Sequence, residues 1–366
     1  MRILFVNGNY NNSAIFRSLS KIQGTTVKTF SQKNLDSFKK GISKKQKNEN
    51  FDVVFFNESQ PLSVPENLEK VNAMKVAYFV DSHLHFHTWH KHFAKLFDVI
   101  LCAQKQYIQK YRRLGLKNVY WLPLFIDPQI DNDLKFKRVS DIGFVGTLNP
   151  IHNPQRSLLL WLLSKKFKLK IGQNTYGKDR AVLYSSSKIV INQSIYSCQN
   201  FRVYESMACG AMLLTDEQEG LEKLFKNKKH LVIYRNFRDA IHLANLYLND
   251  NKKRAKIAEA GHKEVHKNHS SNNRASTIIQ IINKYKTERR VRAYQLNTSY
   301  ILGRTHFFNH NFKEAQYHFE KHLKKNCSNI YAKVELIIYL LVIKHYPNFI
   351  SKLSIVFIKR TIRLLN

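Results

Sequence analysis

Short, unbroken apolar runs constrain what this chain can fold into more than any other feature of its sequence. The runs consist mainly of β-branched, aliphatic and aromatic residues, and longer polar, helix-like stretches separate them. Because apolar and polar residues do not alternate within a run, each run predicts a strand that is covered on both faces of a parallel sheet. The runs lie at 3–6, 51–56, 76–80, 98–103, 118–122, 141–145, 168–171, 188–192, 211–215 and 230–234.

The runs form two series, which lie on either side of a stretch at 123–137 that contains two prolines and three aspartates. This pattern predicts two doubly wound, Rossmann-like α/β domains, at 1–137 and 138–286, with a ligand cleft between them at the carboxyl ends of the strands. Helices are expected at 104–114 (ending at Gly115), 157–165, 201–208, 238–248, 252–266 and 275–285.

A helical tail is expected at 287–366. Its Leu302, Gly303, Ala315 and Phe319 have the spacing of one tetratricopeptide-type helix pair, which must pack on another surface to bury its apolar face. The segment 348–365 mixes large apolar residues with Lys and Arg. It predicts either a basic amphipathic helix for an acidic membrane surface or a helix that caps the tail.

Charge and composition limit the class of protein. The chain has 60 Lys and Arg against 26 Asp and Glu, a net charge of +34, and 43% hydrophobic residues, so we expect a folded basic protein. The charge indicates an anionic partner or, alternatively, a Lys- and Asn-rich composition spread over the surface. With no leader, no apolar run of about 18 residues and four irregularly spaced cysteines, we expect a cytoplasmic protein, at most peripheral at the inner face of the membrane.

The most informative stretch is 200–225. Asn200 is expected to cap a helix whose first turn holds Arg202, a position where backbone N–H groups and the helix dipole attract an anion such as a diphosphate. Glu205 lies one turn further, where its carboxylate can accept hydrogen bonds from a ribose diol. A surface ion pair between Arg202 and Glu205 is the alternative.

A second candidate lies at 143–147, where a strand ends in the sequence GFVGT. Gly146 allows backbone to approach a ligand closely, and Thr147 offers a hydroxyl and an N–H to phosphate. An ordinary strand-to-helix turn is the alternative. Asn192, at the end of another strand, is expected to face the cleft.

Histidines gather at 83–92, but their spacing and surroundings do not favour a metal site. Asp81 and His83 follow the strand at 76–80, so either side chain is expected to reach the cleft and to remove a proton from an acceptor hydroxyl. The alternative is that both residues only shape the cleft or cap the next helix.

Together these residues resemble the glycosyltransferases of the GT-B architecture, and in particular the spore-maturation-protein CgeB-like group, over about residues 75–285. The resemblance rests on a run of the form N-x-R-x-x-E-x-M-A-x-G followed by a strand and an acidic residue. The matching residues are Asn200, Arg202, Glu205, Met207, Ala208, Gly210, Asp216, Gly220, Leu221, Phe225, Tyr234, Arg254, Gly261, His269 and Arg274, with Gly143 to Thr147 and His152 to Arg156 upstream.

The resemblance implies transfer of a sugar from a nucleotide-diphosphate sugar, with a UDP-sugar favoured, to a glycan, lipid-linked or protein acceptor. The donor would bind domain 138–286 and the acceptor domain 1–137. It implies no cofactor and no divalent metal. The donor-binding residues would be Gly146, Thr147, Arg156, Asn192, Asn200, Arg202, Glu205, Asp216 and Gly220.

One position departs from the pattern. Many retaining GT-B enzymes have a second glutamate eight residues before the ribose-binding one, and here that position is Ser197. Retention and inversion at the sugar therefore both stay open. The same residues would also suit a nucleotide-sugar-binding protein that isomerises or hydrolyses its ligand or is inactive. A basic nucleic-acid-binding protein is less favoured, because the chain carries no recognisable motif for that function.

Overall fold

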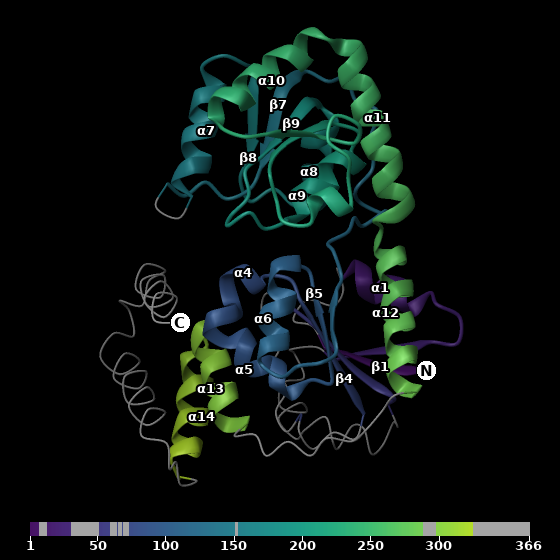
Figure 1. The fold of residues 1–366 in the computed structure, drawn as a ribbon, viewed down its shortest axis with the longest axis vertical. Helices are drawn as coiled ribbons and strands as arrows, with labels where there is room; N and C mark the ends of the chain where they lie inside the picture. The colour runs from purple at the N-terminus through teal and green to yellow at the C-terminus, as the bar shows by residue number, and fades with distance from the viewer. Residues whose placement is uncertain are drawn as a thin grey trace. The chain divides into compact units, whose positions relative to one another are not determined.

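The computed structural model describes residues 1–6, 13–30, 51–58, 64, 68, 73–150, 153–287 and 298–324. These residues form two compact α/β units, each with its own sheet (Figure 1). Unit 1 takes its described residues from Met1–Ala103, Tyr107–Leu122 and Tyr285–Asn366, and unit 2 consists of Gln104–Gln106 and Pro123–Lys284. The expected fold class, two doubly wound parallel-sheet domains with additional C-terminal helices, is confirmed.

Among the described residues, six parallel strands form the sheet of unit 1, in the order β2-β1-β3-β4-β5-β6. All five expected strands are present, and their side chains are almost entirely buried. The sequence does not predict β2, because its residues TVKTF contain no unbroken apolar run; the strand lies at the edge of the sheet. The strands are β1 (Arg2–Val6), β2 (Thr26–Phe30), β3 (Val53–Asn57), β4 (Met74–Phe79), β5 (Val99–Cys102) and β6 (Val119–Trp121).

The described helices of unit 1 are short. The helix expected at 104–114 forms as a 3-10 turn, η6 (Lys105–Tyr107), followed by α6 (Ile108–Arg113), and ends before Gly115, whose φ of +83° is left-handed. After β4 come α4 (Ser82–His85), the π-helical turn η4 (Phe86–His90), α5 (Lys91–Phe93) and η5 (Ala94–Leu96), while α1 (Ala14–Ser20) follows β1.

The sheet of unit 2 has five parallel strands among the described residues, in the order β11-β10-β9-β7-β8. Each corresponds to an expected strand. Its buried core joins Phe144 and Ile191 of the sheet to Leu160 and Tyr247 of the covering helices. The strands are β7 (Ser140–Val145), β8 (Leu169–Gly172), β9 (Ser187–Asn192), β10 (Met212–Asp216) and β11 (Val232–Tyr234).

The helices of unit 2 include one that the sequence does not predict. α8 begins at Gly177 and has Lys178, Asp179 and Arg180 in its first turn, so its apolar periodicity is weak. The expected helices are all present. They are α7 (Pro154–Ser164), α9 (Phe201–Ala208), α10 (Phe237–Asn249), α11 (Asn251–Asn268) and α12 (Ser271–Thr287), with the 3-10 turn η7 (Leu221–Lys223).

The compact units differ from the expected ranges 1–137, 138–286 and 287–366 in three places, the first of which is that Gln104–Gln106 belong to unit 2. The stretch after Leu122 belongs to unit 2, because Arg274 of α12 donates hydrogen bonds to the carbonyls of Pro123 and Leu124 at 2.8 and 3.0 Å. The tail helices α13 (Thr298–Phe308) and α14 (Phe312–Lys324) belong to unit 1.

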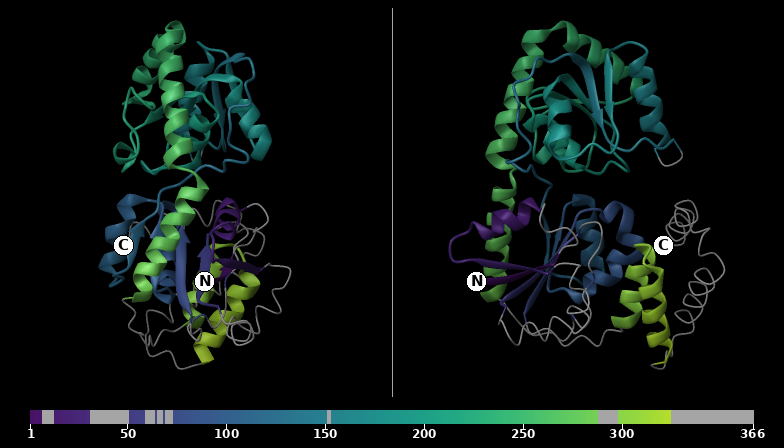
Figure 2. Two further views of the ribbon diagram at one scale, coloured as in Figure 1. Left: turned by 90° about the vertical axis from the view of Figure 1, so that its right-hand side faces the viewer. Right: turned by 180° about the vertical axis from the view of Figure 1, so that it is seen from behind.

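Helices α13 and α14 lie side by side, as Figures 1 and 2 both show. Gly303 makes this packing possible, because a Cβ there would lie 2.3 Å from the Phe319 ring. On unit 1, α13 contacts η4 and α5, and the buried Arg304 donates hydrogen bonds to the Thr88 carbonyl at 3.0 and 3.1 Å. The tetratricopeptide resemblance stays a prediction, and the segment 348–365 lies outside the described residues.

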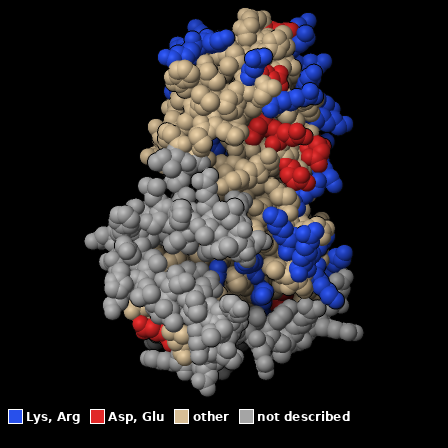
Figure 3. All heavy atoms as spheres, turned by 60° about the vertical axis from the view of Figure 1, so that its left-hand side comes forward, with Lys and Arg blue, Asp and Glu red and all other residues tan. Residues whose placement is uncertain are grey.

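The structure also bears on the distribution of charge and on membrane-spanning helices. Among the described residues on the face drawn in Figure 3, Lys and Arg side chains lie in several groups, with Asp and Glu side chains near some of them. None of the described helices is long and apolar enough to cross a membrane.

Gly261 gives a stability prediction. A Cβ at this position of α11 would lie 2.3 Å from the backbone oxygen of His230, which has little freedom to move. We expect Gly261→Ala to lower the free energy of unfolding by about 1–3 kcal/mol, although alanine favours helix over glycine. Urea unfolding checks this, with Lys256→Ala on the exposed face of the same helix as control. Stabilisation of the Gly261→Ala variant would contradict the packing described.

Candidate functional site

The polar side chains of unit 2 converge where its parallel strands end. Because all five strands run in the same direction, their carboxyl ends meet at one edge of the sheet. This edge holds Gly146 after β7, Asn192 at the end of β9, Asp216 at the end of β10 and Tyr234 at the end of β11. The first turn of α9 reaches the same edge, since Arg202 contacts both β7 and β9. The structure thus brings several of the predicted site residues to one edge of the sheet.

Arg202 is the centre of this edge. Its Nε donates a 2.7 Å hydrogen bond to the Val145 carbonyl, and its guanidinium carbon lies 4.3 Å from the centre of the Phe144 ring. Gly146 has a φ of +155°, and a Cβ there would lie 2.3 Å from Nη2 of Arg202. A glycine is therefore needed at 146 to admit the guanidinium as well as to allow the backbone conformation.

Asn192 joins Arg202 to Asn200. Its Oδ1 accepts hydrogen bonds from Nη1 of Arg202 and, at 3.1 Å, from Nδ2 of Asn200. Asn200 occupies the N-cap position of α9, as expected, but the expected capping hydrogen bond from its side chain is not made. The side chain instead fixes Asn192, so the first N–H groups of α9 are left to other acceptors.

Arg156 of α7 brings a second guanidinium to the same ring of Phe144. It is buried, with its guanidinium carbon 5.6 Å from the ring centre, and it donates to the carbonyls of Thr147 at 3.2 Å and Gln193 at 2.9 Å. Burial, followed by the nearby charge of Arg202, lowers the pKa of Arg156 to about 10. Two guanidinium groups share this edge, which is an arrangement that attracts an anion. The Thr147 side chain is exposed.

Asp216 holds the loop that follows β9. Both carboxylate oxygens accept from the Ser194 N–H at 3.0 Å, and one also accepts from the Ser194 hydroxyl. Burial is the largest influence on Asp216, and it raises the pKa of this carboxyl. In this structure Asp216 therefore positions the main chain of Ser194 at the carboxyl edge of the unit 2 sheet.

Two backbone positions shape the loops of this edge. Gly220, just before η7, has a left-handed φ of +84°, which explains the glycine in the motif. Ser197 is also left-handed, with a φ of +52°, and its carbonyl accepts a 3.1 Å hydrogen bond from the Glu219 N–H. Where many retaining GT-B enzymes have a second glutamate, this chain thus has a serine in a turn.

Glu205 lies in a buried ion-pair network and not on the surface. Its Oε1 is 2.9 Å from Nη1 of Arg180, whose Nη2 bonds Asp131 at 2.5 Å. The alternative of a surface ion pair between Arg202 and Glu205 is therefore wrong. Burial, the largest influence, raises the pKa of Glu205 to about 7 although Arg180 opposes the shift. No sequence pattern pointed to Arg180, because its helix was not predicted.

In unit 1, Asp81 and His83 lie at the carboxyl end of β4, as expected, and both side chains are half-buried. Asp81 begins α4, but its side chain makes no capping hydrogen bond. Burial, with a further contribution from Glu58, raises the pKa of Asp81 to about 7. The alternative in which the Asp81 side chain caps this helix is therefore not what the structure shows.

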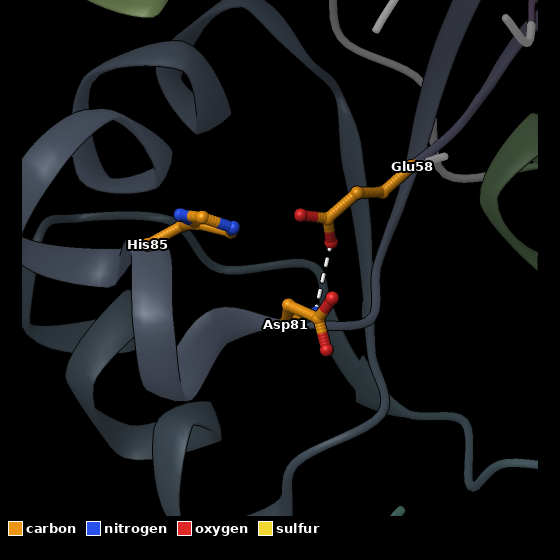
Figure 4. A group of neighbouring side chains, drawn as sticks. All are labelled: Glu58, Asp81 and His85. Atoms are coloured by element: carbon orange, nitrogen blue, oxygen red, sulfur yellow. Dashed lines mark hydrogen bonds between the residues drawn. The ribbon is translucent and has the colours of Figure 1, made fainter. Parts of the chain in front are cut away.

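Sequence reasoning missed Glu58, which follows the neighbouring strand β3. Its Oε2 accepts hydrogen bonds from the backbone N–H groups of Val80 and Asp81 at 2.6 and 3.0 Å (Figure 4). A ligand atom from each of Glu58, Asp81 and His85 lies within 4.8 Å of the others, a spacing that also suits a metal ion. The signal that could have found Glu58 is a carboxylate directly after a buried strand, at the same edge as Asp81.

Comparisons with known proteins find similarity in sequence family and in fold. Residues 146–280 match a family model described as "Glycosyl transferase-like". A search of curated proteins finds no match. The matched region contains all the candidate donor-binding residues, from Gly146 to Gly220.

Several solved structures share the fold across both units. Anabaena HepE in complex with UDP and glucose has a TM-score of 0.56 at 12% identity, covering 78% of this chain and 100% of that chain. Sucrose-phosphate synthase from Thermosynechococcus elongatus has a TM-score of 0.59 at 10% identity, covering 79% and 100%. T4 phage BGT in complex with UDP and Mn²⁺ has a TM-score of 0.54 at 12% identity, covering 77% and 100%. The chain therefore has the fold of GT-B glycosyltransferases.

The ion-pair network around Glu205 gives a pH-dependent prediction. Arg180→Met removes the cation between Glu205 and Asp131, and we expect it to lower the free energy of unfolding at pH 8 by about 3–5 kcal/mol. Both carboxyls already have raised pKa values in the folded state, that of Glu205 being about 7. Without Arg180 they must stay protonated on folding while the unfolded chain ionises above about pH 4.

The decrease in the free energy of unfolding that Arg180→Met causes should therefore be larger at pH 8 than at pH 4. Urea unfolding at pH 5 and pH 8 measures it. Lys178→Met, on the exposed face of the same helix, is the matched control and should change stability little at either pH. An equal loss at both values of pH would contradict the buried pair of carboxylates.

Proposed function

We propose that this protein is a glycosyltransferase that transfers a sugar from a nucleotide-diphosphate sugar to an acceptor. The observation that carries the proposal is the pair of guanidinium groups, Arg156 and Arg202, at the carboxyl edge of the unit 2 sheet beside the start of α9. The glycosyltransferase-like match over residues 146–280 and the GT-B fold support it.

In this proposal the donor diphosphate lies against Arg202, Arg156 and the first turn of α9, with Gly146 and Thr147 closing the site from β7. Negative charge accumulates on the diphosphate as its bond to the sugar breaks, and guanidinium groups and helix N–H groups that are already in place stabilise that charge. Because these groups supply the positive charge, we propose that the donor needs no divalent metal.

The ribose lies one turn further along α9. Glu205 is proposed to accept hydrogen bonds from its hydroxyl groups. Arg180 holds the carboxylate through Oε1, which fixes its orientation before the nucleotide binds. Asn192 and Asn200 keep Arg202 in place, and Asp216 and Gly220 shape the loops around the donor.

Several finer statements belong to the same proposal. A UDP-sugar is the favoured donor, in line with HepE, whose structures contain UDP, glucose or UDP-glucose. We place the chain in the CgeB-like group and expect a glycan, lipid-linked or protein acceptor that binds unit 1, with Asp81 or His83 taking its proton. The protein would act in the cytoplasm, at most at the inner face of the membrane.

A thermal-shift screen of nucleotide-sugars tests the proposal and identifies the donor, since a ligand that binds only the folded state raises the melting temperature. UDP-glucose is the first candidate. Release of UDP that increases when an acceptor is added would support transfer, and EDTA should leave that release unchanged. Absence of a shift with every nucleotide-sugar would refute the proposal.

Site variants give a sharper prediction. We expect Arg202→Ala and Glu205→Ala each to weaken UDP-glucose binding by about 10- to 100-fold, since hydrogen bonds to charged groups contribute about 1.5–3 kcal/mol. Isothermal titration calorimetry measures the dissociation constants. Lys166→Ala removes an exposed positive charge from the opposite end of α7, before β8, and should leave binding unchanged. Equal affinity in all three variants would contradict the site.

A further inference from the structure

A second group of titratable side chains lies in unit 1, around the buried carboxylate of Glu58. Oε1 of Glu58 is 3.0 Å from Nε2 of His90, and Nδ1 of His90 is 3.1 Å from the Tyr111 hydroxyl. The Ser82 hydroxyl is also 3.0 Å from that of Tyr111. Because His90, Tyr111 and Ser82 are fully buried, Glu58 is held in one orientation from the interior of the unit.

The π-helical turn η4 contributes to this arrangement. It ends at His90, and the ring centres of His85 and His90 lie 5.5 Å apart, five residues along the chain. A π-turn is uncommon and is found frequently at functional sites. It brings both histidines to the side of the unit where Glu58 lies.

From this anchored position Glu58 fixes the main chain of Asp81. Oε2 accepts from the N–H of Val80 at 2.6 Å and from the N–H of Asp81 at 3.0 Å, so the turn after β4 has a defined conformation. The Asp81 carboxylate then lies beside Glu58, with a ligand atom of each inside the 4.8 Å cluster (Figure 4). Glu58 is buried, whereas Asp81 is half-buried.

Among the described residues, no Lys or Arg forms an ion pair with either carboxylate. His90 does not compensate the charge, because burial lowers its pKa well below the usual range and keeps it neutral. Because two neighbouring carboxylates without a cation disfavour ionisation of both, one of them retains its proton up to near neutral pH. Such a pair gives up and accepts protons near neutral pH.

We propose that Glu58 and Asp81 form the acid–base pair of unit 1, in which Asp81 takes the proton of the acceptor hydroxyl and Glu58 is its positioning residue. The proposal rests on the glycosyltransferase function proposed above. It selects Asp81 over His83 because Glu58 holds the main chain of Asp81 and shares a proton environment with its carboxylate.

In the proposed step, the acceptor oxygen forms a bond to the anomeric carbon of the sugar, and the proton of the acceptor hydroxyl passes to the Asp81 carboxylate. The bond between the anomeric carbon and the diphosphate oxygen breaks, and its electron pair leaves with UDP. Asp81 returns the proton to water before the next cycle.

Other titratable groups face this pair. His85 of α4 lies within the cluster, His90 comes from η4, and Tyr111 comes from α6. Cys102 of β5 is 3.5 Å from the Ser82 hydroxyl. Tyr111 carries a pKa well above its usual range, mainly through burial, and stays neutral alongside His90. The pKa values of the two carboxyls, Glu58 and Asp81, are both about 7, so both groups titrate near neutral pH.

The test is the pH profile of UDP release from UDP-glucose, with water as acceptor or with the acceptor that the screen identifies. The wild-type rate should rise through about pH 7 as the pair loses its proton. Asp81→Asn should lower the rate by about 100-fold or more and leave UDP binding unchanged. Glu58→Gln keeps an oxygen for the two N–H groups but loses the charge, so the rising limb should move to lower pH.

Asp98→Asn is the matched control. Asp98 accepts a 2.8 Å hydrogen bond from the N–H of Lys75, at the opposite end of β4, so its removal also takes a carboxylate from the main chain of that strand. The Asp98→Asn substitution should leave the rising limb of the pH profile at the wild-type pH. Coincident pH profiles for wild type and Glu58→Gln would overturn the proposal and leave the proposed transferase standing. No binding of UDP-glucose and no UDP release by the wild type would instead refute the proposed function.

The spacing of Glu58, Asp81 and His85 also suits a metal ion, and the same assay decides between the two. A metal site predicts that EDTA abolishes UDP release, that Mn²⁺ restores it, and that the His85→Ala variant no longer responds to either addition. These results would show that a cation lies between the carboxylates, and the proposal would be wrong. His87→Ala, a change of another histidine in the same segment, is the control and should respond as the wild type does. An unchanged rate in EDTA supports the proton-sharing pair.

Discussion

The contact between the Arg202 guanidinium and the Phe144 ring is the interaction on which the edge of unit 2 depends. The guanidinium carbon of Arg202 lies 4.3 Å from the centre of the Phe144 ring. The Val145 carbonyl and the Asn192 side chain accept hydrogen bonds from the guanidinium and fix its orientation. This contact explains the residues around it: Gly146 because a side chain would strike the guanidinium, and Asn200 because its amide orders Asn192. A flexible cationic side chain thus becomes a fixed one, and fixed charges stabilise developing charge without reorganisation.

In both units, like-charged side chains are held close together at the carboxyl ends of the strands. In unit 2 the excess is positive, with Arg156 and Arg202 sharing one ring, whereas in unit 1 it is negative, with Glu58 beside Asp81. In each unit, a buried side chain holds the charged group: Asn192 holds Arg202 in unit 2, and His90 holds Glu58 in unit 1. Parallel strands permit this arrangement because all their carboxyl ends reach one edge.

The sequence predicted much of the fold, because a buried parallel strand leaves a direct signal in an unbroken apolar run. It missed β2, an edge strand whose residues form no unbroken apolar run, and α8, whose first turn is charged. It also placed the division of the chain too late, since Arg274, more than a hundred residues away in sequence, attaches Pro123 and Leu124 to unit 2.

By itself, then, the sequence determined the two parallel sheets, the edge at which polar residues gather, and the local motif from Asn200 to Gly220, because these depend on neighbours in the chain. Only the tertiary structure decided the partners of the charges. Glu205 pairs with Arg180 and not with Arg202, and Glu58 holds Asp81 from a different strand. Burial and through-space distance set those pairings and the pKa values that follow, and neither quantity is encoded in residue spacing along the chain.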